Sequence, residues 1–231
     1  MRKNNPNSLV VAIDGPAGAG KSTIAKMVAA KLGLKYIDTG AMYRALTLKA
    51  LTTGIDCDDA AGLMELLAQS KFEFPVANNV GSPAILLDGR DVSALIRLPE
   101  VSQKVSRVAL VPEVRRELVR IQREQAAGGG IVMDGRDIGT VVLPEADVKI
   151  FLTASLEERA RRRYIELQRK GLPATLEQIK KEIAERDKLD QERKDSPLQA
   201  ASDAICIDTT GFSPEEIVTQ IIHLCAERGE R

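Results

Sequence analysis

The chain has 231 residues, of which 44% are hydrophobic and 29% are charged, and its 33 Lys and Arg residues balance 33 Asp and Glu residues. This length and composition predict one α/β domain with a modest insertion, or two small domains. The balanced charge gives no reason to expect nucleic acid or a membrane as a partner, and the lack of Trp leaves little material for stacking nucleic-acid bases.

The cysteines and the histidine limit the possible chemistry further. Cys57, Cys206 and Cys225 are widely spaced and odd in number, which predicts reduced thiols and neither a disulfide framework nor a zinc site. His223 is the only histidine and lies in an apolar helical pattern, so we interpret it as structural. No apolar run approaches the roughly 20 residues that span a bilayer, and residues 1–8 lack the apolar core of a secretion signal. We therefore expect a cytoplasmic protein.

The first predicted elements are a buried strand at residues 9–13, a glycine-rich loop, and a helix that ends near residue 32 with Gly33 as its cap. The loop reads G-x-x-x-x-G-K-S, the pattern of a P-loop, in which glycines let successive N–H groups turn inward around phosphate oxygens. Lys21 can reach the β- and γ-phosphates, and the Ser22 hydroxyl can bind Mg²⁺. We expect a nucleoside triphosphate to bind here, through Gly15, Pro16, Ala17, Gly18, Ala19, Gly20, Lys21, Ser22 and Thr23.

A second short strand is predicted at residues 34–37, followed by Asp38-Thr39-Gly40, which suits a turn and a helix start. One interpretation of this stretch is simply a well-capped helix. The other is a ligand site, because open α/β sheets bind ligands at the carboxyl ends of their strands. Thr39, Tyr43 and Arg44 are therefore candidate substrate-binding residues.

From residue 56 the pattern changes, and we predict an insertion that extends to residue 100. A short helix at 58–69 precedes Phe72-Glu73-Phe74, which alternates like an edge strand, and Asp88-Gly89 between apolar flanks indicates a hairpin. We therefore expect a small antiparallel sheet over residues 71–92 and a return to helix at 93–97. The residues expected between the strands are Pro75, Asn78, Asn79, Gly81 and Pro83, followed by an apolar run at 84–87.

Two helices, at residues 100–110 and 113–125 and separated by Pro112, precede a buried strand at 131–134. The strand ends in Asp134, which resembles the second acidic element of P-loop enzymes, a residue that positions Mg²⁺. The tetrapeptide Asp-Gly-Arg-Asp occurs at residues 88–91 and again at 134–137. Only the second copy follows a core strand, so only the second copy is a candidate for the active site.

The last third of the chain is rich in arginine. After a strand at 148–152, a helix at 155–168 has arginines on most faces, and Thr175 caps the next helix with Gln178 at the capping-box position. A strand at 204–207 and a helix capped by Ser213 complete the chain. The apolar stripe of the first of these helices consists of Leu156, Ala160, Tyr164 and Leu167.

Within the second of these helices, Arg186, Asp190 and Arg193 are spaced i, i+4 and i+7, which places them on one face. Charges of this kind ordinarily belong to a solvated helix with local ion pairs. The alternative is a clamp for phosphate groups, since a protein with two phosphorylated substrates must neutralise both.

These parts together favour phosphoryl transfer, which needs in-line geometry, Mg²⁺ and positive charge more than covalent chemistry. The chain lacks the N-K-x-D run of a switch GTPase and is short for a motor or a large ATPase. A small-molecule kinase fits, with residues 155–195 as an arginine-rich lid that keeps water away from the reaction.

The motifs at residues 15–23, 38–44, 134–140 and 148–152 together resemble the bacterial cytidylate kinases, a family of P-loop nucleoside monophosphate kinases. The resemblance runs from about residue 10 to the last helix. It implies a single three-layer α/β domain over residues 1–231, with a central five-stranded parallel sheet. It further implies that residues 56–100 form an inserted antiparallel β/α subdomain for the monophosphate and that residues 155–195 form a short helical lid.

The resemblance also implies an activity: Mg²⁺-dependent transfer of the ATP γ-phosphoryl group to CMP or dCMP, by a protein that is usually a monomer. Ser106, Arg115 and Asp137 would read the cytosine, with Asp137 accepting a hydrogen bond from the N4 amino group. Thr39 would face the monophosphate and Asp190 the ribose hydroxyls. Ser22 and Asp134 would bind the metal. The residues that would hold phosphates are Arg44, Arg136, Arg186 and Arg193, of which the last three would act in catalysis with Lys21, and the lid residues near ATP would be Arg159 and Arg163.

Two other functions remain open on the sequence. One is a P-loop kinase for another small metabolite. The other is a binding protein that senses a nucleotide and uses ATP only as a signal, which would bind ATP without acceptor-dependent turnover.

Overall fold

The computed structural model describes residues 8–75, 85–169 and 171–229. The chain divides into two compact units, one made of Met1–Leu34 with Gly129–Arg231 and the other of Lys35–Gly128, and the structure defines each unit separately. Asn78, Asn79, Gly81 and Pro83, which we expected in turns, lie outside the described residues, as does the start of the apolar run at 84–87.

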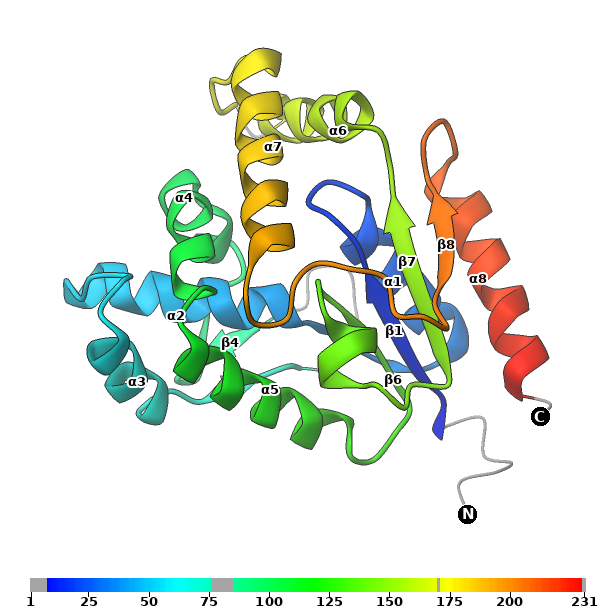
Figure 1. Cartoon of the computed structure of the whole chain (residues 1–231), viewed down its shortest axis with the longest axis horizontal. Helices are drawn as coiled ribbons and strands as arrows, with labels where there is room; N and C mark the ends of the chain where they lie inside the picture. Colours follow the sequence, from blue (N-terminus) through cyan, green and yellow to red (C-terminus); the bar gives the residue numbers. More distant parts are fainter. Residues whose placement is uncertain (1–7, 76–84, 170, 230–231) are drawn as a thin grey trace. The chain divides into compact units, whose positions relative to one another are not determined.

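Five strands form one sheet in the order β2-β6-β1-β7-β8, with β1 in the middle. Figure 1 shows β1, β7 and β8 side by side. β1 pairs in parallel with β6 and with β7, which pairs in parallel with β8. β1 and β6 are buried along their whole length, which explains why both are unbroken apolar runs in the sequence. The predicted α/β class with a central five-stranded parallel sheet is confirmed. The strands are β1 (Val10–Asp14), β2 (Lys35–Asp38), β6 (Ile131–Asp134), β7 (Val148–Thr153) and β8 (Ile205–Asp208).

In the first unit, helix α1 (Lys21–Leu32) starts where the glycine-rich loop ends and packs against β6 and α8 (Pro214–Gly229). Gly33 ends α1 in the left-handed conformation, with φ 65°, as the sequence predicted. The Ser213 hydroxyl accepts the N–H of Glu216 at 3.3 Å and so caps α8, which was also predicted. A π-helical turn, η3 (Ile138–Val142), follows β6 and was not predicted.

Helices α6 (Leu156–Arg169) and α7 (Leu176–Glu192) pack against each other beyond the end of β7 (Figure 1). The predicted apolar stripe of α6 packs around a small core of Ala160, Ile179 and Ile183. The predicted capping box is present, because the Thr175 hydroxyl accepts the N–H of Gln178 and the Gln178 side chain accepts the N–H of Thr175. The helix pair is therefore held by its own apolar seam.

The prediction that Arg193 belongs to this helix is wrong. α7 ends at Glu192, and Arg193 follows it with φ −56° and ψ 134°. The helix cannot continue because the N–H of Leu198 takes the carbonyl of Asp190 at 2.7 Å, which the N–H of residue 194 would need for another turn.

In the second unit, α2 (Thr39–Thr53) packs against α3 (Ala60–Ala68) and against α4 (Pro99–Val108), and α5 (Pro112–Ala126) packs on α3. Pro99 and Pro112 stand in the first turns of α4 and α5, where a missing N–H leaves no bond unmade. The predicted small antiparallel sheet is confirmed as β3 (Phe72–Glu73), β4 (Leu86–Leu87) and β5 (Arg90–Asp91).

The Asp88-Gly89 turn between β4 and β5 has positive φ at both residues, 52° and 77°, as the sequence signal required. The helix expected at residues 93–97 is shorter than predicted, a single 3₁₀ turn, η2 (Leu95–Arg97). Ser93 is held to the hairpin instead, because its N–H donates to Asp91 at 2.9 Å and its hydroxyl bonds the backbone of Ile85.

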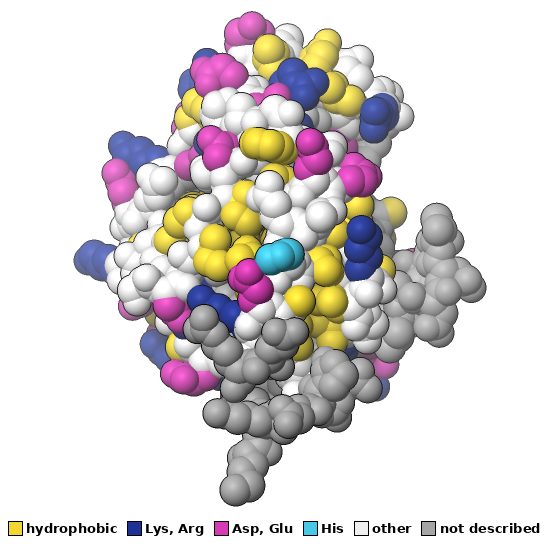
Figure 2. Space-filling model, turned by 90° about the vertical axis from the view of Figure 1, so that its right-hand side faces the viewer, with side chains coloured by type: hydrophobic (Ala, Val, Ile, Leu, Met, Phe, Trp, Pro, Cys, Tyr) yellow, Lys and Arg dark blue, Asp and Glu magenta, His cyan; other side chains and the backbone are white. Residues whose placement is uncertain are grey.

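The cysteines are unpaired, as predicted, with Cys57 and Cys225 buried and Cys206 exposed. His223 lies exposed on α8 with its ring 3.3 Å from Glu227, among hydrophobic side chains of that face (Figure 2). It contributes nothing to the core, so any structural role is limited to this surface pair. None of the helices in the described ranges is long and apolar enough to cross a membrane.

Candidate active site

The loop between β1 and α1 can only be built with glycine at its tightest points. Gly15 has φ 144°, and a Cβ on it would lie 1.9 Å from the carbonyl oxygen of Leu152. Gly18 has φ 78°, and a Cβ there would lie 3.0 Å from the Cβ of Arg159. The loop opens onto the N-terminus of α1, where Gly20 provides no side-chain cap, so the first N–H groups of the helix remain suited to an anion.

Lys21 is buried at the start of α1, and its ammonium group donates to the loop carbonyl of Pro16 at 2.7 Å. Burial, together with the positive charge of Arg136, lowers the pKa of Lys21 to about 7. The negative charge of Asp134 raises the pKa of Lys21 and the positive charge of Arg186 lowers it further. Lys21 therefore interacts electrostatically with Asp134, Arg136 and Arg186. A phosphate group in the loop would oppose these effects and favour the charged lysine.

The Ser22 hydroxyl donates to Asp134 at 2.9 Å, which joins the start of α1 to the end of β6. Asp134 is buried. A hydroxyl and a carboxylate are hard oxygen donors of the kind that Mg²⁺ prefers, and Mg²⁺ commonly takes one or two protein oxygens and completes its shell with phosphates and water. Within the described part of the chain, no cluster of three or more His, Cys, Asp or Glu residues could hold a metal. The Ser22–Asp134 pair therefore fits Mg²⁺ that arrives with a nucleotide.

Asp190 holds a cluster of arginines. Its Oδ2 accepts from Nε of Arg136 at 2.9 Å, and its Oδ1 lies 3.9 Å from Nη1 of Arg193. Burial alone would raise the pKa of Asp190, but the charges of Arg136, Arg186 and Arg193 outweigh burial and hold that pKa below its usual value. Asp190 and Arg193 are buried, so the interpretation of this face as a solvated helix is wrong. Arg193 joins the cluster even though it stands just beyond the helix.

The helix pair touches the glycine-rich loop through Arg159. This buried side chain donates to the carbonyls of Ala17 at 3.1 Å and Ala154 at 3.0 Å, and it pairs with Asp187 of α7. Arg163 pairs instead with Glu166 of its own helix at 2.7 Å, so its assignment to the donor nucleotide stays a prediction.

Arg162, which the sequence did not single out, also lies near the loop. It donates to the hydroxyl and the carbonyl of Thr209, and a Cβ on Gly20 would lie 3.6 Å from its Nη1. The hydroxyl of Thr209 donates to the loop carbonyl of Ala19 at 3.3 Å. The one signal in the sequence was that Thr209 directly follows the last strand, β8.

Asp137 is buried at the start of η3. The next two residues donate their N–H groups to Asp14, Ile138 to Oδ1 at 2.8 Å and Gly139 to Oδ2 at 2.7 Å. Burial raises the pKa of Asp14 to about 6 in spite of these bonds. Asp14 was not predicted to take part in the site, although its place at the end of the first strand was a usable signal.

The second unit gathers the other predicted substrate residues. Asp38 caps α2 by accepting the N–H of Ala41 at 3.0 Å, which confirms the capped helix and leaves the proposed ligand role as a prediction. Nη1 of Arg44 donates to the Ser102 hydroxyl at 2.9 Å and to the carbonyl of Ile96 at 3.3 Å. Ser102 was not predicted to take part.

The guanidinium of Arg115 lies over the ring of Tyr43, 5.7 Å from its centroid, in a cation–π contact. Arg115 and Thr39 are buried, and Ser106 stands on α4 one turn after Ser102. The predicted cytosine-reading residues thus divide between the units, with Ser106 and Arg115 in the second and Asp137 in the first.

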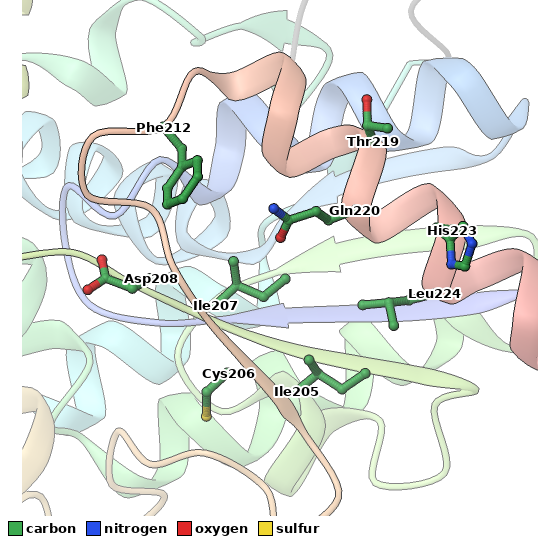
Figure 3. Close-up of a pocket in the computed structure, with 9 residues that line it drawn as sticks. All are labelled: Ile205, Cys206, Ile207, Asp208, Phe212, Thr219, Gln220, His223 and Leu224. Carbon is green, nitrogen blue, oxygen red and sulfur yellow. The ribbon is translucent and has the colours of Figure 1, made fainter.

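A shallow pocket lies elsewhere on the first unit, between β8 and α8. Figure 3 shows Ile205, Ile207, Phe212 and Leu224 around it. None of the predicted site residues lines this pocket, so it does not belong to the candidate active site.

Comparison with known proteins gives one consistent answer. Residues 11–227 match the model of a family described as cytidylate kinase. A cytidylate kinase of Bacillus cytotoxicus is 55% identical over 217 residues, which cover 94% of this chain and 96% of the relative. A cytidylate kinase of Bacillus cereus strain ATCC 10987 is 55% identical over 214 residues, or 93% of this chain and 94% of the relative.

Among solved structures, a gluconokinase from Sinorhizobium meliloti 1021 aligns with a TM-score of 0.50 at 14% identity, over 98% of this chain and 96% of that one. This likeness shows the fold alone. The match to the family model and the two relatives extend over nearly the whole chain, and on that ground the chain belongs to the cytidylate kinase family.

Proposed function

We propose that this protein transfers the γ-phosphoryl group of ATP to CMP or dCMP, giving ADP and CDP or dCDP, with Mg²⁺ as the metal. The observation that carries the proposal is that Lys21 lies within the electrostatic influence of Asp134, Arg136 and Arg186. It is joined by the similarity of the chain to proteins that are named cytidylate kinase. Together these observations support a donor loop, a metal pair and a phosphate clamp at one site.

On the donor side, the loop N–H groups and Lys21 would bind the β- and γ-phosphates. Lys21 would exchange the Pro16 carbonyl for phosphate oxygens, a move that the rotatable side chain allows. Ser22 and Asp134 would hold Mg²⁺, which when bound supplies positive charge to the transferring phosphoryl group and orients the donor.

On the acceptor side, an oxygen of the CMP phosphate attacks the γ-phosphorus. A new P–O bond forms, the bond to the β-phosphate oxygen breaks, and the electron pair leaves with ADP. Arg136, Arg186 and Arg193 would neutralise the charge on the transferring group, with Asp190 fixing their positions and contacting the ribose. The acceptor nucleotide would also be bound by residues of the second unit, as the family resemblance implies: Thr39, Tyr43 and Arg44.

Base choice would depend on Asp137. Its carboxylate can accept from the N4 amino group of cytosine but would face the O4 acceptor of uracil, and one polar group left unpaired costs roughly 1–3 kcal/mol. Ser106 and Arg115 would donate to O2 or N3 of the cytosine. UMP is therefore expected to be the poorer substrate.

The helix pair α6–α7 would act as the lid, with Arg159 joining it to the loop that binds ATP. Excluding water matters because water would otherwise accept the phosphoryl group. We further propose that the protein acts in the cytoplasm and, as the family resemblance implies, as a monomer.

The proposal is tested by incubating the protein with Mg·ATP and a panel of CMP, dCMP, UMP, AMP, GMP and shikimate, and measuring ADP release. We expect the fastest release with CMP or dCMP. Faster release with any other acceptor would contradict the proposed substrate. Tight binding of ATP with no acceptor-dependent release would instead indicate a nucleotide-sensing protein.

A further inference from the structure

The turn that follows Asp137 is capped by a carboxylate from a distant part of the chain. Asp137 starts η3, and its carbonyl accepts the N–H groups of Val141 at 2.9 Å and Val142 at 3.1 Å. The first N–H groups of such a turn have no partner within it, and the side chain of the N-cap residue ordinarily accepts one of them. The Asp137 carboxylate does not take this role.

Asp14 takes it instead, with both oxygens. It accepts from Ile138 at 2.8 Å and from Gly139 at 2.7 Å, and it is only 4% exposed. Hydrogen bonds to an ionised carboxylate are about twice as strong as neutral ones. A Cβ on Gly139 would lie 3.4 Å from the Asp14 carboxylate, which is an ordinary contact distance, so the bond from Gly139 does not depend on the lack of a side chain.

The backbone just before Asp137 is also hydrogen-bonded to β1. The N–H of Gly135 donates to the carbonyl of Ile13 at 3.0 Å, and Ile13 pairs with Asp134 in the parallel sheet. Residues on both sides of Asp137 are therefore attached to the last two residues of β1. The same strand end leads into the loop that binds phosphate.

We infer that Asp14 is a positioning residue for base recognition: by capping η3 it fixes the backbone at Asp137, and so the position from which the Asp137 carboxylate would meet the cytosine amino group. Because Asp137 reads cytosine only if cytidine nucleotides are the substrates, the assignment rests on the proposed function.

The test is Asp14→Asn, which keeps the shape of the side chain but offers one acceptor oxygen where two N–H groups need two. We expect the ratio of kcat/KM for CMP over UMP to fall about tenfold, mainly through a higher KM for CMP. We also expect the amides of Ile138 and Gly139 to exchange hydrogen about tenfold faster. This second readout does not depend on activity.

Asp147→Asn is the matched control. Asp147 accepts the N–H of Val10 at 2.8 Å, at the opposite end of β1, so the same substitution removes the charge of a carboxylate that binds this strand away from η3. The control should leave the CMP/UMP ratio and the exchange of the two amides as they are in the wild type. A control that lowered the ratio as far as Asp14→Asn would overturn the assignment, because the effect would then come from general loss of stability.

The outcomes separate the two claims. If the wild type prefers CMP and Asp137→Ala loses that preference while folded Asp14→Asn keeps it, the positioning role is wrong and the proposed function stands. If the wild type shows no preference for CMP over UMP, the proposed base recognition fails, and the positioning role falls with it. Should Asp14→Asn not fold, Asp14→Glu keeps two acceptor oxygens but displaces them by one methylene, so it must lower the ratio; an unchanged ratio there overturns the assignment.

Discussion

Asp190 is the carboxylate at the centre of the arginine cluster, and replacing it with Asn should measurably destabilise the protein. Its two oxygens lie 2.9 Å from Arg136 and 3.9 Å from Arg193, and it is 5% exposed. Removing one partner of a buried ion pair costs about 3–5 kcal/mol, because the remaining charge is left buried. Asn keeps the shape and one acceptor oxygen, so we expect about 3 kcal/mol, which corresponds to a fall in Tm of roughly 6–12 °C for a chain of this size.

The assay is thermal unfolding at pH 7, followed by circular dichroism. Glu185→Gln is the control on the same helix: Glu185 pairs with Lys181 at 3.9 Å and both side chains are exposed, so its loss should change the free energy of unfolding by at most about 0.5 kcal/mol. The pKa of Asp190 is held below its usual value, so its stabilising contribution is complete above about pH 4 and is lost as the pH falls further. The difference between wild type and Asp190→Asn should shrink accordingly in acid. An Asp190→Asn variant as stable as the wild type at pH 7 would refute the account of the cluster.

Three further predictions concern the first unit. Lys21→Ala should lower kcat by roughly 10²–10³-fold, because the positive charge that would stabilise the transferring phosphoryl group is lost. A loss of less than tenfold would contradict this role of Lys21. Asp134→Asn should raise the Mg²⁺ concentration for half-maximal activity roughly tenfold, with recovery at high Mg²⁺, whereas an unchanged Mg²⁺ requirement removes Asp134 from the metal site. Burial raises the pKa of Asp14 from 3.8 to about 6, so between pH 3.8 and pH 6 its carboxyl group is protonated in the native state and ionised in the unfolded state. The stability of the wild type relative to Asp14→Asn should therefore fall by up to about 3 kcal/mol as the pH rises from 4 to 6.5, and a constant difference would contradict a buried carboxylate.

The parts of the fold that the sequence predicted well depend on neighbouring residues. The Asp88-Gly89 turn requires positive φ at two consecutive positions, and few residue pairs supply that. The capping box at Thr175 is likewise a contact between residues three apart. The buried strands could be recognised because a strand covered on both faces is an unbroken apolar run.

The contacts that the sequence could not predict join residues far apart in the chain. Asp14 binds N–H groups more than 120 residues later, and the π-helical turn that it caps has no signature of its own. Ser102 reaches Arg44 and Asp187 reaches Arg159 only once the helices have packed. The end of α7 was missed for a more local reason, since it depends on a backbone bond from Leu198 to Asp190 that no sequence pattern predicts.

The central claim is that this family member phosphorylates cytidine monophosphates and selects them with Asp137. The most direct measurement is kcat/KM for CMP and for UMP, in the wild type and in Asp137→Ala, at saturating Mg·ATP. The account predicts that the wild type favours CMP by about tenfold or more and that the variant loses most of this preference through a higher KM for CMP. Equal use of CMP and UMP by the wild type, or an unchanged preference in the variant, would contradict it.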